Sequence, residues 1–389
     1  MKHQIYLIVI LCNLFFANGL FGQKTLEFAT LNEAKQAASL QHKPLMVMLY
    51  ADWCEHCKKM KQEVLPSPEI NTLLKTRFAT VAINAEKEGA SLAKQFMVNQ
   101  YPTFLFFNEQ NELIYGFMGE FNSADFQKEC QQALIPEAQF PTLKKRFEQN
   151  PKQAQYCLDY VMALRKIRFN YGKPAQQYLA QVSDNELLSE IHWKIIANGI
   201  MAISSREIQF VLKNQAAFAK IASPKRVERK LVNVVQEALF PLTEQGDTLR
   251  YSAVRAQVKA MNYAKADSLA FEMDCQLYEK VSNWKKYKTI TQENTVKWAL
   301  KNPQLLKRIV ANYLEHVSDE QALKQAESWA IQLKTTQPNK ENYRNLGKLY
   351  LKLKQFDQAK ETLNEGISAL KDMHFDSSEL ERLLLEVPR

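Results

Sequence analysis

The stretch YADWCEHCKKM, residues Tyr50 to Met60, decides how the N-terminal part of this chain is interpreted. It places Cys54 and Cys57 two residues apart, directly after an apolar run and directly before lysines. Such a pair can belong to a metal site, a structural disulfide or a redox-active dithiol. The remaining sequence distinguishes between these three interpretations.

The metal site and the structural disulfide find little support. A zinc site needs about four ligands, usually from a second C-x-x-C pair or from paired histidines. The six histidines are scattered, and the later cysteines lack the required spacing: Cys130, Cys157 and Cys275. A disulfide between Cys54 and Cys57 would close a tiny loop and constrain the unfolded chain little. We therefore predict a dithiol that needs no metal and no cofactor.

The dithiol interpretation has a physical mechanism. The apolar run PLMVMLYA is typical of a buried strand, and a helix is expected from the cysteines to about Val64. Cys54 then lies at the N-terminus of that helix, where free N–H groups and the helix dipole favour an anion. Its thiol pKa falls from about 8.5 into a range of roughly 3.5–7.5. Cys54 attacks a substrate disulfide, and the more buried Cys57 resolves the mixed disulfide.

Residues 24–135 alternate strand and helix patterns in the order βαβαβαββα, which predicts a mixed central sheet with helices on both faces. Strands are expected at TLEFA, PLMVMLYA, FATVAIN, PTFLFF and LIYGFMG. Besides the cysteine helix, helices are expected at LNEAKQAASLQ, EINTLLKTR, EGASLAKQFMV and NSADFQKECQQAL, the last capped by Asn122 or Ser123.

The cysteine stretch resembles the active-site segment of the thioredoxin family. It is most similar to the thioredoxin-like domains of exported thiol:disulfide interchange proteins, in which Ala51-Asp52-Trp53 before the first cysteine is typical. The predicted strand order is also that family's order. The resemblance covers about residues 24–135, and it implies a thioredoxin fold with Cys54 and Cys57 as catalytic residues.

A second motif, QYPTFLFF, strengthens the resemblance. It implies that Pro102 is cis and faces the cysteine pair, with Tyr101 before it, and that the neighbouring backbone pairs with the substrate strand. The resemblance therefore suggests four substrate-binding residues: Trp53, Tyr101, Pro102 and Thr103.

One position departs from the family pattern. The family usually buries an acid six residues before the first cysteine, as proton acceptor for the resolving cysteine, and this position is Met48 here. Either another proton acceptor replaces this acid, namely Glu86, Glu63 or water, or deprotonation of Cys57 is slow. Fast turnover is therefore in doubt.

The two residues between the cysteines, Glu55 and His56, are expected to tune the pKa of the Cys54 thiol. A protonated or hydrogen-bond-donating His56 would stabilise the thiolate, and the Glu55 carboxylate would oppose it. The alternative for His56 is an exposed spacer.

The first residues have the pattern of a signal peptide. Lys2 and His3 precede the apolar run from Ile5 to Phe16, and small residues follow at Gly19 and Gly22. A membrane span needs about 20 apolar residues, so cleavage is favoured over an uncleaved anchor. We therefore predict an exported protein, periplasmic or secreted, with no membrane span after cleavage.

Beyond Pro136 the pattern becomes helical. Only 5 of the 10 glycines fall in the last 253 residues, and helix-length amphipathic segments follow one another. We expect them to be separated at the later prolines: Pro151, Pro174, Pro224, Pro241, Pro303 and Pro338.

The segment ENYRNLGKLYLKLKQFDQAKETLNEGISAL resembles a tetratricopeptide repeat. Small residues at Gly347 and Gly366 would let its two helices approach closely; the alternative is a helical hairpin that mimics one repeat. The expected organisation is a signal peptide at 1–22, a thioredoxin-like domain at 23–136, a helical domain of unknown type at 137–305, and tetratricopeptide-like helical repeats at 306–389.

Charge is uneven along the chain. Residues 23–136 carry 11 Lys and Arg against 13 Asp and Glu, whereas residues 137–389 carry 39 against 29. The basic part could favour acidic partners or a membrane surface, but a solvated helical surface explains it better. No interleaved aromatic and basic motif indicates nucleic acid.

Taken together, the sequence predicts an exported thiol:disulfide oxidoreductase that acts on protein thiols and disulfides. Its helical domain would bind a partner or substrate protein. The alternative is a partner-binding helical scaffold whose thioredoxin-like module has little turnover.

Overall fold

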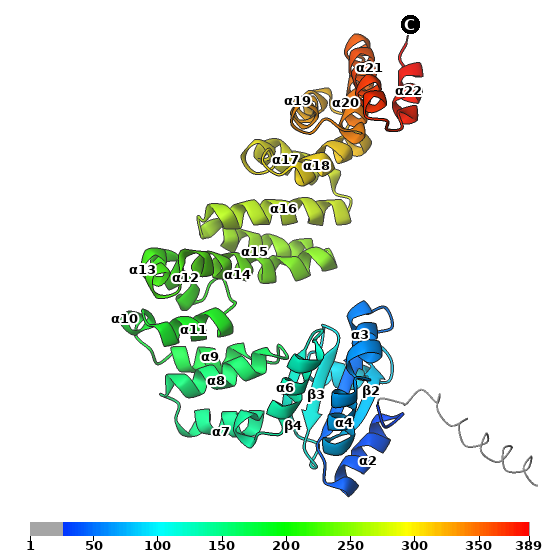
Figure 1. Cartoon of the computed structure of the whole chain (residues 1–389). Helices are drawn as coiled ribbons and strands as arrows, with labels where there is room; N and C mark the ends of the chain where they lie inside the picture. The colour runs from blue at the N-terminus through cyan, green and yellow to red at the C-terminus, as the bar shows by residue number, and fades with distance from the viewer. Residues whose placement is uncertain (1–25, 389) are drawn as a thin grey trace, which may run out of the picture. The chain divides into compact units, whose positions relative to one another are not determined.

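The computed structural model describes residues 26–388 (Figure 1). The chain divides into two compact units, one ending at Ile200 and the other beginning at Met201. The predicted signal peptide at 1–22 lies outside the described residues.

The first unit is built around a four-stranded mixed sheet with the strand order β2-β1-β3-β4. β1 is parallel to β2 and antiparallel to β3, and β3 is antiparallel to β4. The strands are β1 (Leu45–Tyr50), β2 (Ala79–Asn84), β3 (Thr103–Phe107) and β4 (Leu113–Met118). The predicted mixed sheet is confirmed.

Helices cover both faces of this sheet, because successive side chains of a strand point to opposite sides. Leu45, Val47 and Leu49 pack against one set of helices, whereas Met46 and Met48 pack against another. The first face is covered by α2 (Leu31–Gln41) and α5 (Ala90–Gln95). The second is covered by α3 (Glu55–Lys59), α4 (Pro68–Arg77) and α6 (Ser123–Ala133), the last capped by Asn122.

The first predicted strand is wrong. The described residues of TLEFA, 26–29, contribute only an isolated bridge between Phe28 and Val81. The chain turns into α2 immediately afterwards, because Thr30 and Glu33 form a capping box that starts the helix. The helix expected after the cysteines does reach Val64, although its second half, η1 (Met60–Val64), is a π-helix.

After Pro136 the described part of the first unit contains helices and no strand. Residues of the first two long helices, including Phe140, Leu143 and Leu164, join the core on the β1 face that carries Val47. The core around the sheet therefore continues beyond residue 136, and the predicted domain bounds stay a prediction. The helices are η2 (Pro136–Ala138), α7 (Phe140–Gln149), α8 (Ala154–Arg165), α9 (Gly172–Leu179), α10 (Asp184–Leu187) and α11 (Glu190–Gly199).

The described residues of the second unit form helices joined by short loops and contain no strand, which confirms the predicted all-α region. Its helices are α12 (Arg206–Lys213), α13 (Gln215–Ile221), α14 (Pro224–Gln245), α15 (Thr248–Ala260), α16 (Ala264–Lys280), α17 (Trp284–Trp298), α18 (Pro303–His316), α19 (Glu320–Thr336), α20 (Lys340–Lys352), α21 (Phe356–Asp372) and α22 (Ser378–Leu385).

Two prolines do not separate helices as predicted. Pro174 lies in the first turn of α9. N–H groups in this turn have no acceptor within the helix, so the N–H that proline lacks costs no hydrogen bond. Pro241 lies inside α14, near its C-terminal end. By contrast, Pro224 and Pro303 begin their helices, a position that suits the fixed φ of proline.

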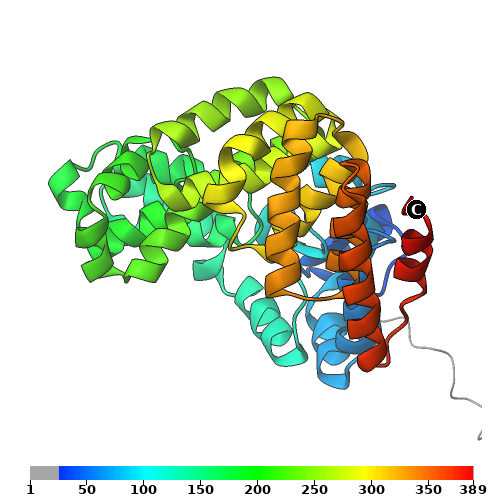
Figure 2. The same cartoon turned by 90° about the horizontal axis from the view of Figure 1, so that it is seen from above.

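The helices α20 and α21 lie side by side in both views (Figures 1 and 2). A Cβ atom placed on Gly347 would lie 2.7 Å from Leu363 Cδ2, and one on Gly366 would lie 2.7 Å from Tyr343 Cγ. Both glycines are therefore points of close helix approach, as the repeat resemblance implies. The identity of the region as tetratricopeptide-like stays a prediction.

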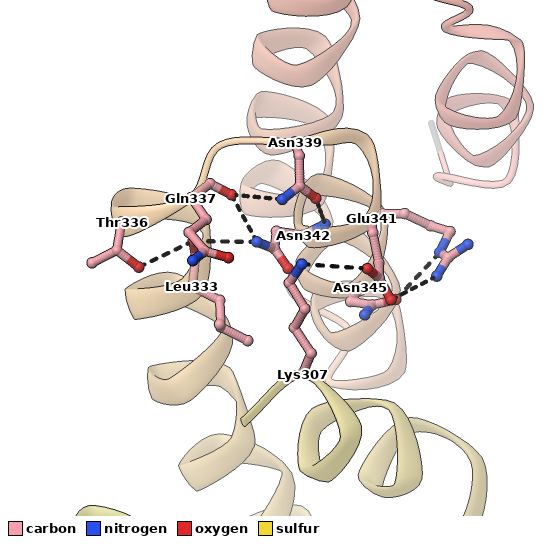
Figure 3. Close-up of polar contacts among 9 residues, drawn as sticks. Lys307, Leu333, Thr336, Gln337, Asn339, Glu341, Asn342 and Asn345 are labelled. Atoms are coloured by element: carbon pink, nitrogen blue, oxygen red, sulfur yellow. Dashed lines mark hydrogen bonds and ion pairs between the residues drawn. The ribbon is translucent and has the colours of Figure 1, made fainter. Parts of the chain in front are cut away.

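A buried amide joins α20 to the preceding helix (Figure 3). Asn342, 1% exposed, donates to the carbonyl oxygens of Leu333 and Gln337 at the end of α19. Asn339 caps α20 by accepting from the Asn342 N–H. These bonds fix the turn between α19 and α20, since the last carbonyls of a helix have no intrahelical partner.

Candidate active site

Cys54 and Cys57 lie at the start of the helix that follows β1. Cys54 is the N-cap of α3, and the two cysteines are joined by a disulfide with their Cα atoms 5.3 Å apart. The Cys54 sulfur accepts the backbone N–H of Cys57 over 3.1 Å. An anion on this sulfur would lie at the N-terminus of the helix, where the backbone N–H groups and the helix dipole favour a thiolate.

The two sulfurs differ in their surroundings. Cys54 lines an open groove, whereas Cys57, 1% exposed, lies in the apolar core with Met48 and Met60. The groove is lined by Trp53, Cys54, Glu55, His56, Asn99, Gln100, Tyr101, Met118 and Gly119. A substrate can therefore reach Cys54 more readily than Cys57.

Two of the four predicted substrate-binding residues, Trp53 and Tyr101, line this groove. The Tyr101–Pro102 peptide bond is cis, as the resemblance implies. Tyr101 packs edge-on against Trp53, with ring centroids 5.9 Å apart. Pro102 and Thr103 are buried and are not among the lining residues; the Thr103 hydroxyl donates to the Gln100 carbonyl over 2.7 Å. Trp53 and Tyr101 thus form the accessible surface, and Thr103 supports it.

Polar contacts surround the groove. Trp53 Nε1 donates to Glu86 Oε1 over 2.9 Å, although Trp53 remains 65% exposed. Glu55 is paired with Lys58 over 2.6 Å. A hydrogen bond from Lys87 holds the pKa of the Asp52 carboxyl below its ordinary value. The charges of this rim are largely paired with one another.

His56 has a partner that the sequence analysis missed. Its Nδ1 lies 2.6 Å from Glu120 Oε2, and the other oxygen of Glu120 accepts from Lys59. The signal in the sequence was the position of Glu120 directly after the last predicted strand, because that strand pairs with the strand that follows the cis proline. Periodicity alone cannot reveal such a contact between residues far apart in the sequence.

No substitute for the missing buried acid is found among residues 26–388. Met48 is fully buried, whereas Glu63 and Glu86 are both exposed. The buried carboxylates of the described chain are Glu207 and Asp274, both in the second unit. The described chain therefore offers no buried carboxylate as a substitute, and Glu63, Glu86, water or slow deprotonation of Cys57 stay the alternatives.

Lys61, which the sequence pattern does not single out, makes a cation–π contact near the cysteine helix. Its ammonium lies 2.9 Å from the centroid of the Tyr50 ring, at the end of β1. Burial lowers the pKa of Lys61. The ring face offers this cation a favourable electrostatic contact.

The described chain holds three further cysteines besides the pair. Cys130, Cys157 and Cys275 are free and buried. Burial raises the pKa of Cys157 to about 12, and it also raises the pKa of Cys130 and Cys275. Within residues 26–388 no cluster of three or more metal-ligating side chains occurs.

The fold and the site define a thioredoxin-fold domain with a C-x-x-C pair at a helix N-terminus. Residues 27–109 match the family model described as thioredoxin-like. The N-terminal part of this chain is therefore a domain of the thioredoxin family.

Curated relatives match the same part of the chain. A thiol:disulfide interchange protein DsbD of Yersinia pestis (strain Pestoides F) is 42% identical over 91 residues, which are 21% of this chain and 15% of that protein. The DsbD of Haemophilus ducreyi is 35% identical over 101 residues, 24% of this chain and 18% of that protein. The match thus spans less than a fifth of these relatives.

Two solved structures are also similar to this part. A thioredoxin from Thermus thermophilus is 28% identical, with a TM-score of 0.27, and the alignment covers 28% of this chain and 88% of that one. The C-terminal domain of Neisseria meningitidis DsbD in the reduced form is 26% identical, with a TM-score of 0.24 and coverage of 26% and 93%.

Across residues 26–388, no helix combines the length and the apolar character that crossing a membrane requires.

Proposed function

We propose that this protein is an exported thiol:disulfide oxidoreductase whose working groups are Cys54 and Cys57. The observation that carries the proposal is the asymmetry of the pair: Cys54 lines the groove and accepts an N–H at the helix N-terminus, and Cys57 is buried behind it. The relatives named thiol:disulfide interchange proteins support it.

The reaction has two exchange steps. The Cys54 thiolate attacks one sulfur of a substrate disulfide, which forms a mixed disulfide and releases the other substrate sulfur as a thiolate. Cys57 loses its proton and attacks the Cys54 sulfur, which releases the second substrate thiolate. The substrate disulfide is reduced by two electrons, and the Cys54–Cys57 dithiol is oxidised to the disulfide seen here. The reverse sequence oxidises a substrate dithiol.

The groove residues have distinct roles in this proposal. Trp53 and Tyr101 offer an aromatic surface beside the sulfur, and the backbone near Pro102 and Thr103 would pair with the substrate strand. Glu55 and His56 would tune the acidity of Cys54. Protein thiols and disulfides are the proposed substrates.

The helical region is proposed to select the substrate or partner protein. The close approaches at Gly347 and Gly366 support a tetratricopeptide-like arrangement for the last helix pair. Stacked helix pairs create extended surfaces that suit protein binding. Export to the periplasm or beyond rests on the signal-peptide pattern at 1–22.

The second candidate is a partner-binding scaffold with little turnover. It is favoured by Met48, which is fully buried where the family pattern has an acid, and by the exposure of both Glu63 and Glu86. Without a nearby proton acceptor, resolution by Cys57 would be slow.

Turnover separates the two candidates. We would measure reduction of insulin by the full chain with dithiothreitol as electron donor, using Cys54→Ser as the inactive control. Catalysis well above the control supports the oxidoreductase. A rate equal to that of Cys54→Ser would contradict it and favour the scaffold.

A further inference from the structure

A single carboxylate ties the cysteine helix to the far side of the groove. Glu120 follows β4, and its two oxygens accept from His56 Nδ1, over 2.6 Å, and from Lys59. Gly119 before it has φ of +108°, a backbone conformation that favours glycine. This turn brings Glu120 from the end of β4 to α3.

The loop that carries Glu120 is anchored in the core. Phe121 packs edge-on against Phe117, with ring centroids 5.1 Å apart, and its N–H donates to the Met60 sulfur over 3.3 Å. The Glu120 side chain is 26% exposed, whereas that of His56 is 70% exposed. Glu120 is therefore the fixed member of the pair, and His56 is the member that would otherwise move freely.

The hydrogen bond to Glu120 places a hydrogen on one nitrogen of the histidine ring. An ionised carboxylate only accepts hydrogen bonds, so Nδ1 of His56 carries the hydrogen. Hydrogen bonds from Lys59 and His56 hold the pKa of the Glu120 carboxyl below its ordinary value. Lys59 also offsets the charge of Glu120, which reduces the direct effect of that charge on a thiolate at Cys54.

We propose that Glu120 is a positioning residue that holds His56 at the groove beside Cys54, and that it stabilises the Cys54 thiolate through His56. This inference rests on the proposed redox function and deepens it. The other charged groups near His56 are Glu55 and Lys58, which pair with each other on α3. Glu120 is thus the group that connects His56 to another element.

The test compares Glu120→Ala, His56→Ala and the double variant in the full-length protein. The readouts are the ultraviolet absorbance of the Cys54 thiolate against pH and the equilibrium with glutathione. Glu120→Ala should raise the pH at which the thiolate forms and make the disulfide about tenfold less oxidising, which is about 30 mV. His56→Ala should do the same, and the double variant should match His56→Ala.

Two results would overturn the inference. One is an effect of Glu120→Ala that persists at full size when His56 is already alanine, because the carboxylate would then act by its own charge. The other is Glu120→Gln behaving no better than Glu120→Ala, because glutamine keeps an acceptor oxygen and should recover at least half of the effect. An unchanged potential in Glu120→Ala also contradicts it.

The controls separate this inference from the proposed function. Glu69→Ala removes an exposed carboxylate from α4 and should leave both readouts unchanged. If the wild-type pair exchanges with glutathione, the redox proposal stands whatever Glu120 does. If the wild-type pair does not exchange, both proposals fail together.

Discussion

Cys57 donates its backbone N–H to the Cys54 sulfur over 3.1 Å, yet only Cys54 lines the groove. The relative exposures are small for both, 4% for Cys54 and 1% for Cys57, so access depends on the groove rather than on exposed area. A bulky substrate disulfide can meet Cys54 there. Cys57 can then act only on a disulfide already formed at its neighbour.

The first prediction is that Cys57→Ser accumulates mixed disulfides through Cys54, and that Cys54→Ser does not. With Cys57 replaced, nothing resolves the mixed disulfide. Non-reducing electrophoresis and mass spectrometry of trapped proteins from the exported fraction would measure it. Equal trapping by both variants, or by neither, would show that the assigned roles are wrong.

The second prediction concerns thiol reactivity. In the reduced native protein, Cys54 should react with a thiol reagent, whereas Cys57 and the three other buried cysteines should not. Burial raises the pKa of Cys157 to about 12, so at pH 8 roughly one molecule in ten thousand carries that thiolate. Raising the pH increases this fraction tenfold per unit until unfolding exposes all three.

Counting modified cysteines by intact mass checks this prediction, with denatured protein as the control. One fast thiol in the native state and four more after denaturation are expected among the cysteines of residues 26–388. Rapid native modification of Cys130, Cys157 or Cys275 would contradict the burial argument and would complicate any trapping experiment.

The sequence predicted the sheet because its strands are continuous apolar runs between helical segments with clear ends. It overestimated the first strand, since nothing in TLEFA shows that the capping box at Thr30 would start a helix so soon. It also placed breaks at Pro174, which the first turn of α9 accommodates without loss of a hydrogen bond, and at Pro241, which lies inside α14 near its C-terminal end. Local sequence patterns thus identified most helices and strands. They failed where a helix-start signal follows a short strand pattern, and where a proline lies inside a helix.

The site was predictable only where the chemistry is local in sequence. Cys54 and Cys57 are two residues apart, and their helix N-terminus follows from the strand before them. The bond from His56 to Glu120 joins residues 64 apart in the sequence, and its existence depends on the turn after β4. A contact of this kind can be identified only once the three-dimensional fold is known.

The third prediction is that Gly366→Ala destabilises the protein. Alanine would add about 1 kcal/mol of helix propensity. Its Cβ would lie 2.7 and 2.8 Å from Tyr343 Cγ and Cβ, atoms near the backbone of a buried residue that cannot swing away. Overpacking costs about 1–3 kcal/mol, so we expect a net loss. Thermal unfolding would measure it, with exposed Ser368→Ala on the same helix as control.

A gain in stability for Gly366→Ala as large as helix propensity predicts would show that the two helices are not closely packed there. Gly347→Ala should be milder, because its nearest contact, 2.7 Å away, is Cδ2 at the flexible end of Leu363. The order of the two effects therefore tests the geometry of this helix pair.

The last prediction concerns a buried charge cluster in the second unit. Arg255 Nε pairs with Asp274 over 3.1 Å, and the Tyr251 hydroxyl donates to the same carboxylate over 2.7 Å. Asp274 is 8% exposed. Arg255→Met would leave this carboxylate without its charge partner, which costs about 3–5 kcal/mol when a buried pair is broken on one side.

The loss should depend on pH in a defined direction. Burial raises the pKa of Asp274 even with Arg255 present, and Arg255 lowers it, so removing Arg255 raises it further. Asp274 in the folded state thus has a pKa above its unfolded value of about 3.9. Its protonation then contributes to the stability of the fold, and this contribution is complete when the pH is below the unfolded pKa. That contribution is lost as the pH rises through the folded pKa. The penalty of Arg255→Met is therefore largest at neutral pH and shrinks on acidification.

Urea unfolding of wild type and variants at about pH 7 and about pH 5 would measure this difference. The matched control is Arg250→Met, because Arg250 is 72% exposed and its contact with Asp247 spans 3.8 Å, so it should lose at most about 1 kcal/mol. Replacing both partners, Arg255→Met with Asp274→Leu, should recover most of the stability, since no unpaired charge stays buried. A penalty for Arg255→Met that does not shrink on acidification would mean that Asp274 remains ionised in the folded variant, and the assigned direction of its pKa would be wrong.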